Sequence, residues 1–457
     1  MDLANAPSRA IGEMAATLRL GDVPTAVVEQ AKLHILDALG LALASSVQDF
    51  GLSALAGVSA MGASGNCSVI GRSERLDMRD AALVNGVLIH GLDFDDTHLA
   101  SIIHATATAL PAALAVGEAL DASGADMLAA FIAGAETGIR IGLAVDGGFH
   151  HTGHHATGMV SHFASGVTAG RLLGLDAEAI TAAQGIAGST ASGIQVFLEE
   201  GAWTKRFHPG WGAVAGITAA HLARAQFKAP TRVYEGRFGL FQAHLQGRET
   251  RGAEIARGLG QVWHFGDTAL KPYPVCHFIH GCADAAIGLH AEIAGVEIIS
   301  VEALLGEPTL HIVAEPAEAK QRPTNEYEVK FSAQFVTAYC LLYGRFGLPD
   351  LLPAAIADAA ALALAQKVAC RADPQSRFPT YFSGGVTVTL ADGRVLSRHV
   401  PINSGAGERA LTQQQVVAKF MASASLAVSN DQATCIKHAV LRLDEIPVRE
   451  LMAILRS

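Results

Sequence analysis

The chain has 457 residues, of which 50% are hydrophobic and only 17% are charged. Its formal net charge is −10 and it has no cluster of Lys and Arg of the kind that grips phosphates, which argues against nucleic-acid binding. The six cysteines are scattered without a CxxC pair, so they predict neither a disulfide framework nor a zinc site. The N-terminus has no basic leader, and we expect a cytoplasmic protein.

The length suggests two or three domains, at about 150 residues per domain. No apolar run reaches the ~20 residues needed to cross a bilayer, because Asp37, Glu118 or Glu136 interrupts each of the longest ones. Low charge together with abundant apolar residues suggests that a partner subunit covers part of the surface. We therefore expect a homodimer that does not associate with membranes.

The first 265 residues or so have a helical pattern. A helix is expected to start at Pro24, a second to open at Pro111 and run to Leu120, and a third to run from about Asp126 to Val145. Asp176 is expected to cap a helix over residues 177–186. The many Gly and Ala residues let helices approach closely, so this part predicts a compact helical bundle.

The pattern changes after residue 274. Residues 308–316 are expected to form a strand, and residues 384–400 to form a hairpin that turns at Asp392-Gly393. Helices are expected again at 411–423 and 448–455. The sequence thus predicts a mainly α fold. It combines a large all-helical domain (residues 1–268 and 405–457) with a smaller α+β lid domain (residues 269–404).

An acidic cluster stands out in an otherwise apolar segment: Asp93, Asp95 and Asp96 lie within four residues, near histidines at 90, 98 and 104. Carboxylates are costly to bury unless they are paired, hydrogen-bonded or used. Any one of them can equally cap a helix or pair with a buried arginine. The cluster as a whole, with Thr97 and His104, favours a site in which a carboxylate acts as general base.

A histidine-rich segment follows, with five histidines in the thirteen residues 150–162. It has no HExxH pattern, which argues against a simple zinc peptidase. The favoured interpretation is that one histidine serves as acid or base while the others are bystanders. A zinc hydrolase built on His150, His151, His154 and His155 ranks last.

Two later segments carry cations. Lys205 and Arg206 are adjacent beside aromatic residues and can hold a carboxylate, although a solvated surface turn explains them as well. Lys271 lies in the stiff segment Lys271–Pro274, and His277 and His280 follow at a predicted helix start. A lone cysteine in such a place is more often a small buried hydrophobe than a nucleophile.

Taken together, these motifs resemble the MmgE/PrpD family, which includes 2-methylcitrate dehydratase, cis-aconitate decarboxylase and iminodisuccinate epimerase. The most specific part is the string from His90 to His98. The order of the other matching segments along the chain also agrees with the family: Leu36–Gly40, Ala81–Gly86, His155–Gly158, Thr204-Lys205, Lys271–Pro274 and Asp392–Arg394. The resemblance implies a helical domain with a smaller lid, a dimer, a site between the domains, and chemistry with no metal and no organic cofactor.

The resemblance carries the family's site residues over to Asp93, Thr97, His104, His155, Lys205 and Lys271. The expected catalytic residues are Asp93, His104, His155, Lys205 and Lys271. The expected substrate-binding residues are Thr97, Arg206, Cys276, His277 and His280. One departure matters, because the decarboxylase branch has a histidine five residues after the lysine, where this chain has Cys276. That difference counts against decarboxylation.

The leading functional hypothesis is a metal-independent lyase that eliminates water from a small di- or tricarboxylate, in the manner of 2-methylcitrate dehydratase. Proton removal next to a carboxylate creates extra negative charge, which fixed cations must stabilise. An epimerase or isomerase, a cis-aconitate decarboxylase-like enzyme and an inactive carboxylate-binding protein are the alternatives. The particular acid, its stereochemistry, the pathway and the histidine of 150–155 that faces the substrate stay open at this point.

Overall fold

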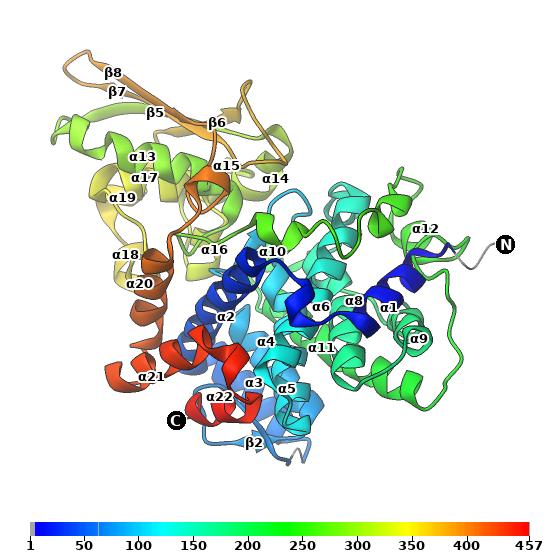
Figure 1. Ribbon diagram of the computed structural model, residues 1–457. Coiled ribbons are helices and arrows are strands. Elements are labelled where there is room, and N and C mark those ends of the chain that lie inside the picture. Colours follow the sequence, from blue (N-terminus) through cyan, green and yellow to red (C-terminus); the bar gives the residue numbers. More distant parts are fainter. Residues whose placement is uncertain (1–4, 63, 457) are drawn as a thin grey trace. The chain divides into compact units, whose positions relative to one another are not determined.

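The computed structural model describes residues 5–62 and 64–456. The chain divides into two compact units (Figure 1). The first contains the described residues up to Phe197, then Trp203–Thr268, then those from Thr412 onward. The second contains Leu198–Ala202 and Ala269–Leu411. Residues 405–411, expected in the helical domain, therefore pack with the second unit instead.

The first unit is built almost entirely of helices. Its helices are α1 (Pro7–Thr17), α2 (Thr25–Ser46), α3 (Asp49–Ser59), α4 (Met78–Ile89), α5 (Ala105–Leu120), α6 (Gly124–Val145), α7 (Gly148–His151), α8 (Ala156–Leu172), α9 (Ala177–Ala187), α11 (Thr204–Arg224), α12 (Leu240–His244), α20 (Gln413–Ala424), α21 (Asn430–Leu441) and α22 (Val448–Ile454). The short strands β1 (Cys67–Ser68) and β2 (Arg75–Leu76) pair antiparallel, β3 is Thr97–His98, and α10 (Phe197–Glu200) and β4 (Thr268–Ala269) lie at the unit boundary.

Two predicted helix starts are confirmed and one is wrong. Helix α2 begins directly after Pro24, and the Asp176 side chain caps α9 by accepting a hydrogen bond from the backbone N–H of Ala179. Helix α5 begins at Ala105, not at Pro111, which lies inside the helix. Proline lacks the N–H that would bond to the fourth preceding carbonyl. The alanine-rich turn before Pro111 is completely buried, so its packing favours the helix despite that loss.

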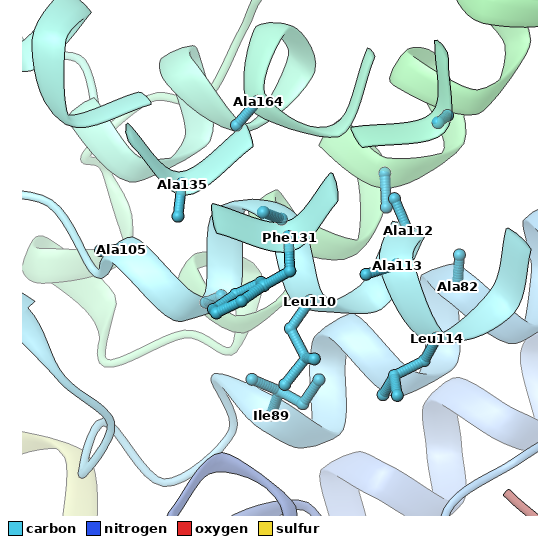
Figure 2. Packing of buried hydrophobic residues seen from close by; sticks show 14 of the residues in the cluster. Ala82, Ile89, Ala105, Leu110, Ala112, Ala113, Leu114, Phe131, Ala135 and Ala164 are labelled. Carbon is cyan, nitrogen blue, oxygen red and sulfur yellow. The ribbon is translucent and has the colours of Figure 1, made fainter. Parts of the chain in front are cut away.

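The core of the first unit lies around α5 and α6, which are buried along most of their lengths. Figure 2 shows Ile89, Leu110, Leu114 and Phe131 filling the space between neighbouring helices, with alanines where the helices approach closely. A fully buried Leu or Phe side chain contributes roughly 1.5–3 kcal/mol relative to an exposed one. The helical bundle thus supplies a rigid frame for the residues at its helix ends.

Helix α6 corrects one expectation about apolar segments. By length and composition it is apolar enough to cross a membrane, although Glu136 and Arg140 lie within it. However, 94% of its most apolar window is buried inside the protein, as in a core helix. Glu136 pairs with Arg140 at 2.7 Å, and both side chains are buried. Pairing within the helix explains how this apolar segment accommodates two charges.

Glycines bring three of these helices close together. A Cβ on Gly86 of α4 would lie 2.4 Å from the Cα of Gly210 of α11, and one on Gly210 would lie 2.3 Å from the Leu83 carbonyl oxygen. A Cβ on Gly212 of α11 would lie 2.4 Å from the Cβ of Ser161 of α8. No side chain fits at these crossings. The end of α4 and the beginnings of α8 and α11 are consequently held near one another.

The second unit combines a small sheet with helices. Its strands are β5 (Ile298–Leu305), β6 (Val368–Ala372), β7 (Gly384–Leu390) and β8 (Val395–Val400), in the order β6-β5-β7-β8. Strands β5 and β6 run parallel and the other pairs antiparallel. Its helices are α13 (His280–Ile293), α14 (Leu310–Val313), α15 (Ala317–Gln321), α16 (Glu326–Lys330), α17 (Ala333–Tyr343), α18 (Pro353–Ile356) and α19 (Ala359–Ala365). Helices α13 and α17 pack on the sheet (Figure 1).

The predicted hairpin is confirmed, since β7 and β8 pair around the Asp392-Gly393 turn. The predicted strand at 308–316 is wrong, because that segment forms a short 3-10 turn followed by α14. The Thr309 hydroxyl caps this turn by donating to the Gly306 carbonyl at 2.7 Å, and Gln334 donates to the Ala314 carbonyl. These local bonds replace those of a sheet neighbour. The mainly helical class with a smaller α+β part is confirmed.

Candidate active site

Four of the side chains in the candidate site stand at helix ends of the first unit. His90 follows the last residue of α4, His104 and His155 directly precede α5 and α8, and Lys205 is the second residue of α11. The N-terminus of a helix carries a partial positive charge and free N–H groups. Three helix N-termini therefore open at the residues of this site, which favours a bound anion.

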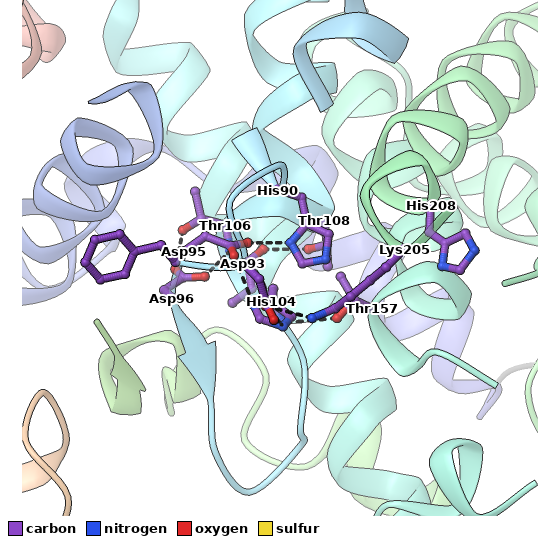
Figure 3. Close-up of polar contacts among 12 residues, drawn as sticks. His90, Asp93, Asp95, Asp96, His104, Thr106, Thr108, Thr157, Lys205 and His208 are labelled. Carbon is purple, nitrogen blue, oxygen red and sulfur yellow. Dashed lines mark hydrogen bonds and ion pairs between the residues drawn. The ribbon is translucent and has the colours of Figure 1, made fainter. Parts of the chain in front are cut away.

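Asp93 and Lys205 form the central ion pair. The Lys205 Nζ donates to Asp93 Oδ1 at 2.6 Å, and both side chains are almost fully buried. His104 Nε2 lies 3.7 Å from the same oxygen (Figure 3). Asp93 has a left-handed backbone with φ of 52°, a conformation that Asp tolerates better than most residues. The turn aims the carboxylate at the lysine and the histidine, so the predicted grouping of Asp93, His104 and Lys205 has a structural basis.

Asp95 lies behind this pair and contacts two histidines. Its carboxylate is 2.8 Å from His90 Nδ1 and 3.3 Å from His104 Nδ1. Burial raises the pKa of Asp95, but the charges and hydrogen bonds of the two histidines outweigh it and hold this pKa well below the usual value. Burial lowers the pKa of His90 to about 4 despite the nearby Asp95. The ionised carboxylate fixes the ring orientation of His90 through one oxygen, and its other oxygen lies beside His104 Nδ1.

His155 lies beside His208, with 2.9 Å between their Nδ1 atoms. Burial, together with the charges of His208 and Lys205, holds the pKa of His155 well below its usual value. Burial likewise lowers the pKa of His208 to about 4, with His90 and Lys205 acting in the same direction. Both rings are therefore neutral at pH 7, and one Nδ1 donates its proton to the other. A neutral imidazole in this position can accept a proton from a substrate.

Asp96 has a structural role. Its carboxylate accepts hydrogen bonds from the backbone N–H and the hydroxyl of Thr106 in the first turn of α5, and it lies 2.6 Å from His34 Nδ1. The same loop is held from the other side by Lys419 of α20, whose Nζ donates to the Phe94 carbonyl at 2.7 Å. The alternative that one aspartate caps a helix thus applies to Asp96. Asp93 therefore forms the ion pair with Lys205, whereas Asp95 and Asp96 contact the histidines and the helix start around it.

Thr97 and Arg206 lie close to these residues in the chain. Thr97 is buried in β3, and its hydroxyl has no hydrogen-bond partner among the residues that the structure describes. The Arg206 guanidinium lies 4.0 Å from the centroid of the Phe50 ring and is buried. It is therefore not part of a solvated surface turn. Substrate binding by these two residues stays a prediction.

The remaining predicted residues belong to the second unit. Lys271 is fully buried, and the His277 and His280 rings lie 4.3 Å apart where a 3-10 turn leads into α13. Asn403 Nδ2 is 2.9 Å from His277 Nε2. Cys276 is also buried, as expected of a small hydrophobic residue. His277, His280 and Asn403 form a second polar cluster. Participation of Lys271, Cys276, His277 and His280 in the same site stays a prediction.

Two further histidines, His90 and His208, join the predicted residues in the structure. His90 stands at the start of the most specific motif, where the sequence pattern alone assigns it no separate role. His208 lies three residues after Lys205, on the same face of α11, and this spacing places it near Lys205 without indicating its contact with His155. His208 contacts the predicted residue His155 through a ring nitrogen, and His90 contacts Asp95 of the acidic cluster in the same way.

Comparison with known protein families finds two matching domains in this chain. The sequence model of the MmgE/PrpD N-terminal domain matches residues 9–253, and that of the MmgE/PrpD C-terminal domain matches residues 273–445. The chain belongs to the MmgE/PrpD family. The aspartates, the histidines and Lys205 of the first-unit site all fall within the MmgE/PrpD N-terminal domain, whereas His277 and His280 fall within the C-terminal domain.

Several curated MmgE/PrpD relatives match along the chain. The cis-aconitate decarboxylase-like protein oryM of Aspergillus oryzae is 26% identical over 96% of this chain and 95% of the relative. The cis-aconitate decarboxylase of Homo sapiens is 28% identical over 94% and 90%. That of Aspergillus terreus is 31% identical over 59% and 57%. This member of the family is thus similar over most of its length to proteins named for a reaction of a small carboxylate.

Proposed function

We propose that this chain is a metal-independent lyase that acts on a small di- or tricarboxylate through a carbanion next to a carboxylate. The observation that carries the proposal is the buried Asp93–Lys205 pair at 2.6 Å, with His104 beside it and helix N-termini around it. A fixed ammonium and helix N-termini stabilise negative charge that develops on a bound carboxylate. Lys205 supplies the positive charge for this stabilisation, so the proposed reaction does not need a metal ion.

The reaction we place first is decarboxylation of a cis-aconitate-like substrate, because relatives that match 94–96% of the chain bear that name. The bond between carbon and the departing carboxylate breaks, CO2 leaves, and the electron pair stays on the carbon. A proton from His104 then replaces the lost group. The step needs no oxidant and consumes one proton. Lys205 and the N-termini of α8 and α11 hold the remaining carboxylates.

Dehydration of a 2-methylcitrate-like hydroxy acid is the second candidate, and Cys276 is the observation that favours it. The resemblance places a histidine at this position in the decarboxylase branch, whereas the buried Cys276 is a poor proton donor. In dehydration, Asp93 or the neutral His155 takes the proton next to the carboxylate. The carbon–oxygen bond breaks, and a second acid protonates the departing hydroxyl. The same residues thus serve both reactions.

The proposal also includes Thr97, Arg206 and Lys271 as binding groups for the substrate carboxylates, with the homodimer and the cytoplasmic location expected from the sequence. A buried hydroxyl such as that of Thr97 gains a partner when an anion binds. Lys271 would add a second ammonium to that of Lys205. Two cations match a substrate with at least two carboxylates.

The direct test is to incubate EDTA-treated protein separately with cis-aconitate and with 2-methylcitrate. Release of CO2 and product NMR report decarboxylation, and a rise of alkene absorbance in the ultraviolet reports dehydration. Turnover of either acid without added metal supports the lyase, and the faster substrate decides between the two reactions. Binding of both acids without turnover would instead identify a carboxylate-binding protein. Activity that appears only after zinc or iron is added would contradict a metal-independent reaction.

A further inference from the structure

Three histidines of the first unit converge in a way that the proposed lyase does not require. One ring nitrogen from each of His90, His104 and His155 lies within 4.8 Å of the others. The rings of His90 and His104 are 4.5 Å apart, and those of His90 and His155 are 5.7 Å apart. The rings come from the ends of three different helices, so the grouping is a product of the fold and not of one short sequence motif.

The Nδ1 atom of each ring already faces a partner. His90 Nδ1 is 2.8 Å and His104 Nδ1 is 3.3 Å from an oxygen of Asp95, and His155 Nδ1 is 2.9 Å from His208 Nδ1. Histidines that ligate a metal typically use their second nitrogen for such a contact, which fixes the ring and its tautomer. These contacts leave Nε2 of His90 and His155 for another role, while His104 Nε2 lies 3.7 Å from Asp93 Oδ1.

His90 gives an independent sign that the site is prepared for a ligand. Its Nε2 is buried and has no hydrogen-bond partner among the described residues. A buried polar atom without a partner costs about 1–3 kcal/mol. Asp95 already fixes the ring through Nδ1, so Nε2 does not contribute to that contact. A bound ligand that accepts the Nε2 lone pair would remove this cost.

We propose that His90, His104 and His155 form a binding site for a divalent transition-metal ion, with zinc the best fit, and that the ion inhibits the enzyme. Three imidazoles with a fourth open position are a common ligand set for zinc. The carboxylates of Asp93 and Asp95 supply negative charge near the site, which offsets the positive charge of the Lys205 ammonium. One oxygen of Asp93 lies 3.7 Å from His104 Nε2. The predicted inhibition rests on the proposed function, because the ion would occupy ring nitrogens that the reaction uses. The predicted metal binding does not depend on the proposed function.

The geometry requires only small movements. With Zn–N distances of about 2.0–2.1 Å, tetrahedral ligand nitrogens lie roughly 3.4 Å apart. One nitrogen of each ring lies within 4.8 Å of the other two, so these separations need to shrink by at most roughly 1.4 Å for the rings to hold an ion. Of the four histidines in the zinc site that the histidine-rich segment suggested, only His155 belongs to this group.

The experiment measures metal binding to the full chain without turnover. EDTA-treated protein is freed of chelator and titrated with Zn²⁺ against a chromophoric chelator, and with Co²⁺ while the visible spectrum is recorded. We expect one tight equivalent per chain and the intense visible bands of four-coordinate Co²⁺. His90→Gln and His155→Gln should each weaken Zn²⁺ binding at least tenfold, on the order expected for loss of a ligand. The double variant His150→Gln/His151→Gln should bind like the wild type.

Two results would overturn the proposal. One is a tight equivalent that persists in folded His90→Gln and His155→Gln; the other is an equivalent that disappears in His150→Gln/His151→Gln. Since His90 is buried, its variant is checked by circular dichroism. If it does not fold, anomalous scattering at the zinc edge from a wild-type crystal soaked in Zn²⁺ decides, and an ion elsewhere refutes the site. Zn²⁺ should also stop turnover, and EDTA should restore it. Binding without inhibition would contradict the catalytic roles of these histidines but leave the metal site intact.

Discussion

The acidic loop at residues 93–98 and the histidine-rich segment at 150–155 look equally functional as sequence, yet they differ in the structure. Every residue of the acidic loop is buried, and its carboxylates contact histidines and a lysine from other helices. Among residues 150–155, His151 is exposed and His155, directly before the long helix α8, is the one buried histidine. The position of a polar residue at a buried helix end predicts the site better than the local density of polar residues does.

The sharpest way to test this comparison is Lys205→Met, which removes the ammonium from the buried pair. We expect a loss of about 10²–10³-fold in kcat, because the charge that stabilises the developing anion is gone. The variant leaves Asp93 buried without the lysine, so it is compared with Lys205→Met/Asp93→Asn. The double variant should regain thermal stability without regaining activity. Activity within a few fold of the wild type in either variant would remove Lys205 from the chemistry.

Asp93→Asn tests the other member of the pair. If Asp93 is the base, kcat falls on the order of a hundredfold. Asn keeps the shape and tolerates the left-handed backbone at this position, so the fold should persist. Steady-state kinetics with the better of the two substrates gives the measurement. A change of only a few fold would give the role of base to His155 and leave Asp93 as the partner that orients Lys205.

Much of the fold could be predicted from the sequence. The helical class, the start of α2, the Asp176 cap and the hairpin of β7 and β8 follow from local patterns and were predicted. Local signals failed where packing decides, as at Pro111 inside α5 and in the 308–316 segment, whose hydrogen bonds come from Gly306 and Gln334. The pairs of His90 with Asp95 and of His155 with His208 depend on three-dimensional contacts and could not be predicted from spacing.

Lys419→Met tests whether the acidic loop depends on support from α20. Lys419 Nζ donates to the Phe94 carbonyl at 2.7 Å and pairs with the buried Asp37 at 2.9 Å. Removing one partner of a buried pair costs about 3–5 kcal/mol. We expect a clear fall in the free energy of unfolding and a loss of activity smaller than that of Asp93→Asn. Denaturant unfolding measures the first. An unchanged stability would mean that the loop is held by α5 and α2 alone.

His208→Gln tests the neutral histidine pair through pH. In the folded protein the pKa of His208 lies at about 4, below its usual 6.5, so the unfolded chain binds more protons between these values. Stability is therefore lost as pH falls from about 6.5 towards 4, by up to about 3 kcal/mol from this group. The variant should show a smaller fall of Tm between pH 7 and pH 4.5 than the wild type. An identical fall in both proteins would show that His208 is not the group that titrates.

The smallest effect is expected from His151→Gln in the histidine-rich segment. This side chain is exposed at the end of α7, and exposed substitutions away from special features change stability by about ±0.5 kcal/mol at most. We expect kcat, KM and Tm to stay within error of the wild type, in contrast to His155→Gln four residues later. A tenfold loss of activity would place the exposed part of the segment in the reaction. The number of histidines in a segment would then indicate function even where the side chains are exposed. The contrast between the buried acidic loop and the exposed part of the histidine-rich segment would no longer hold.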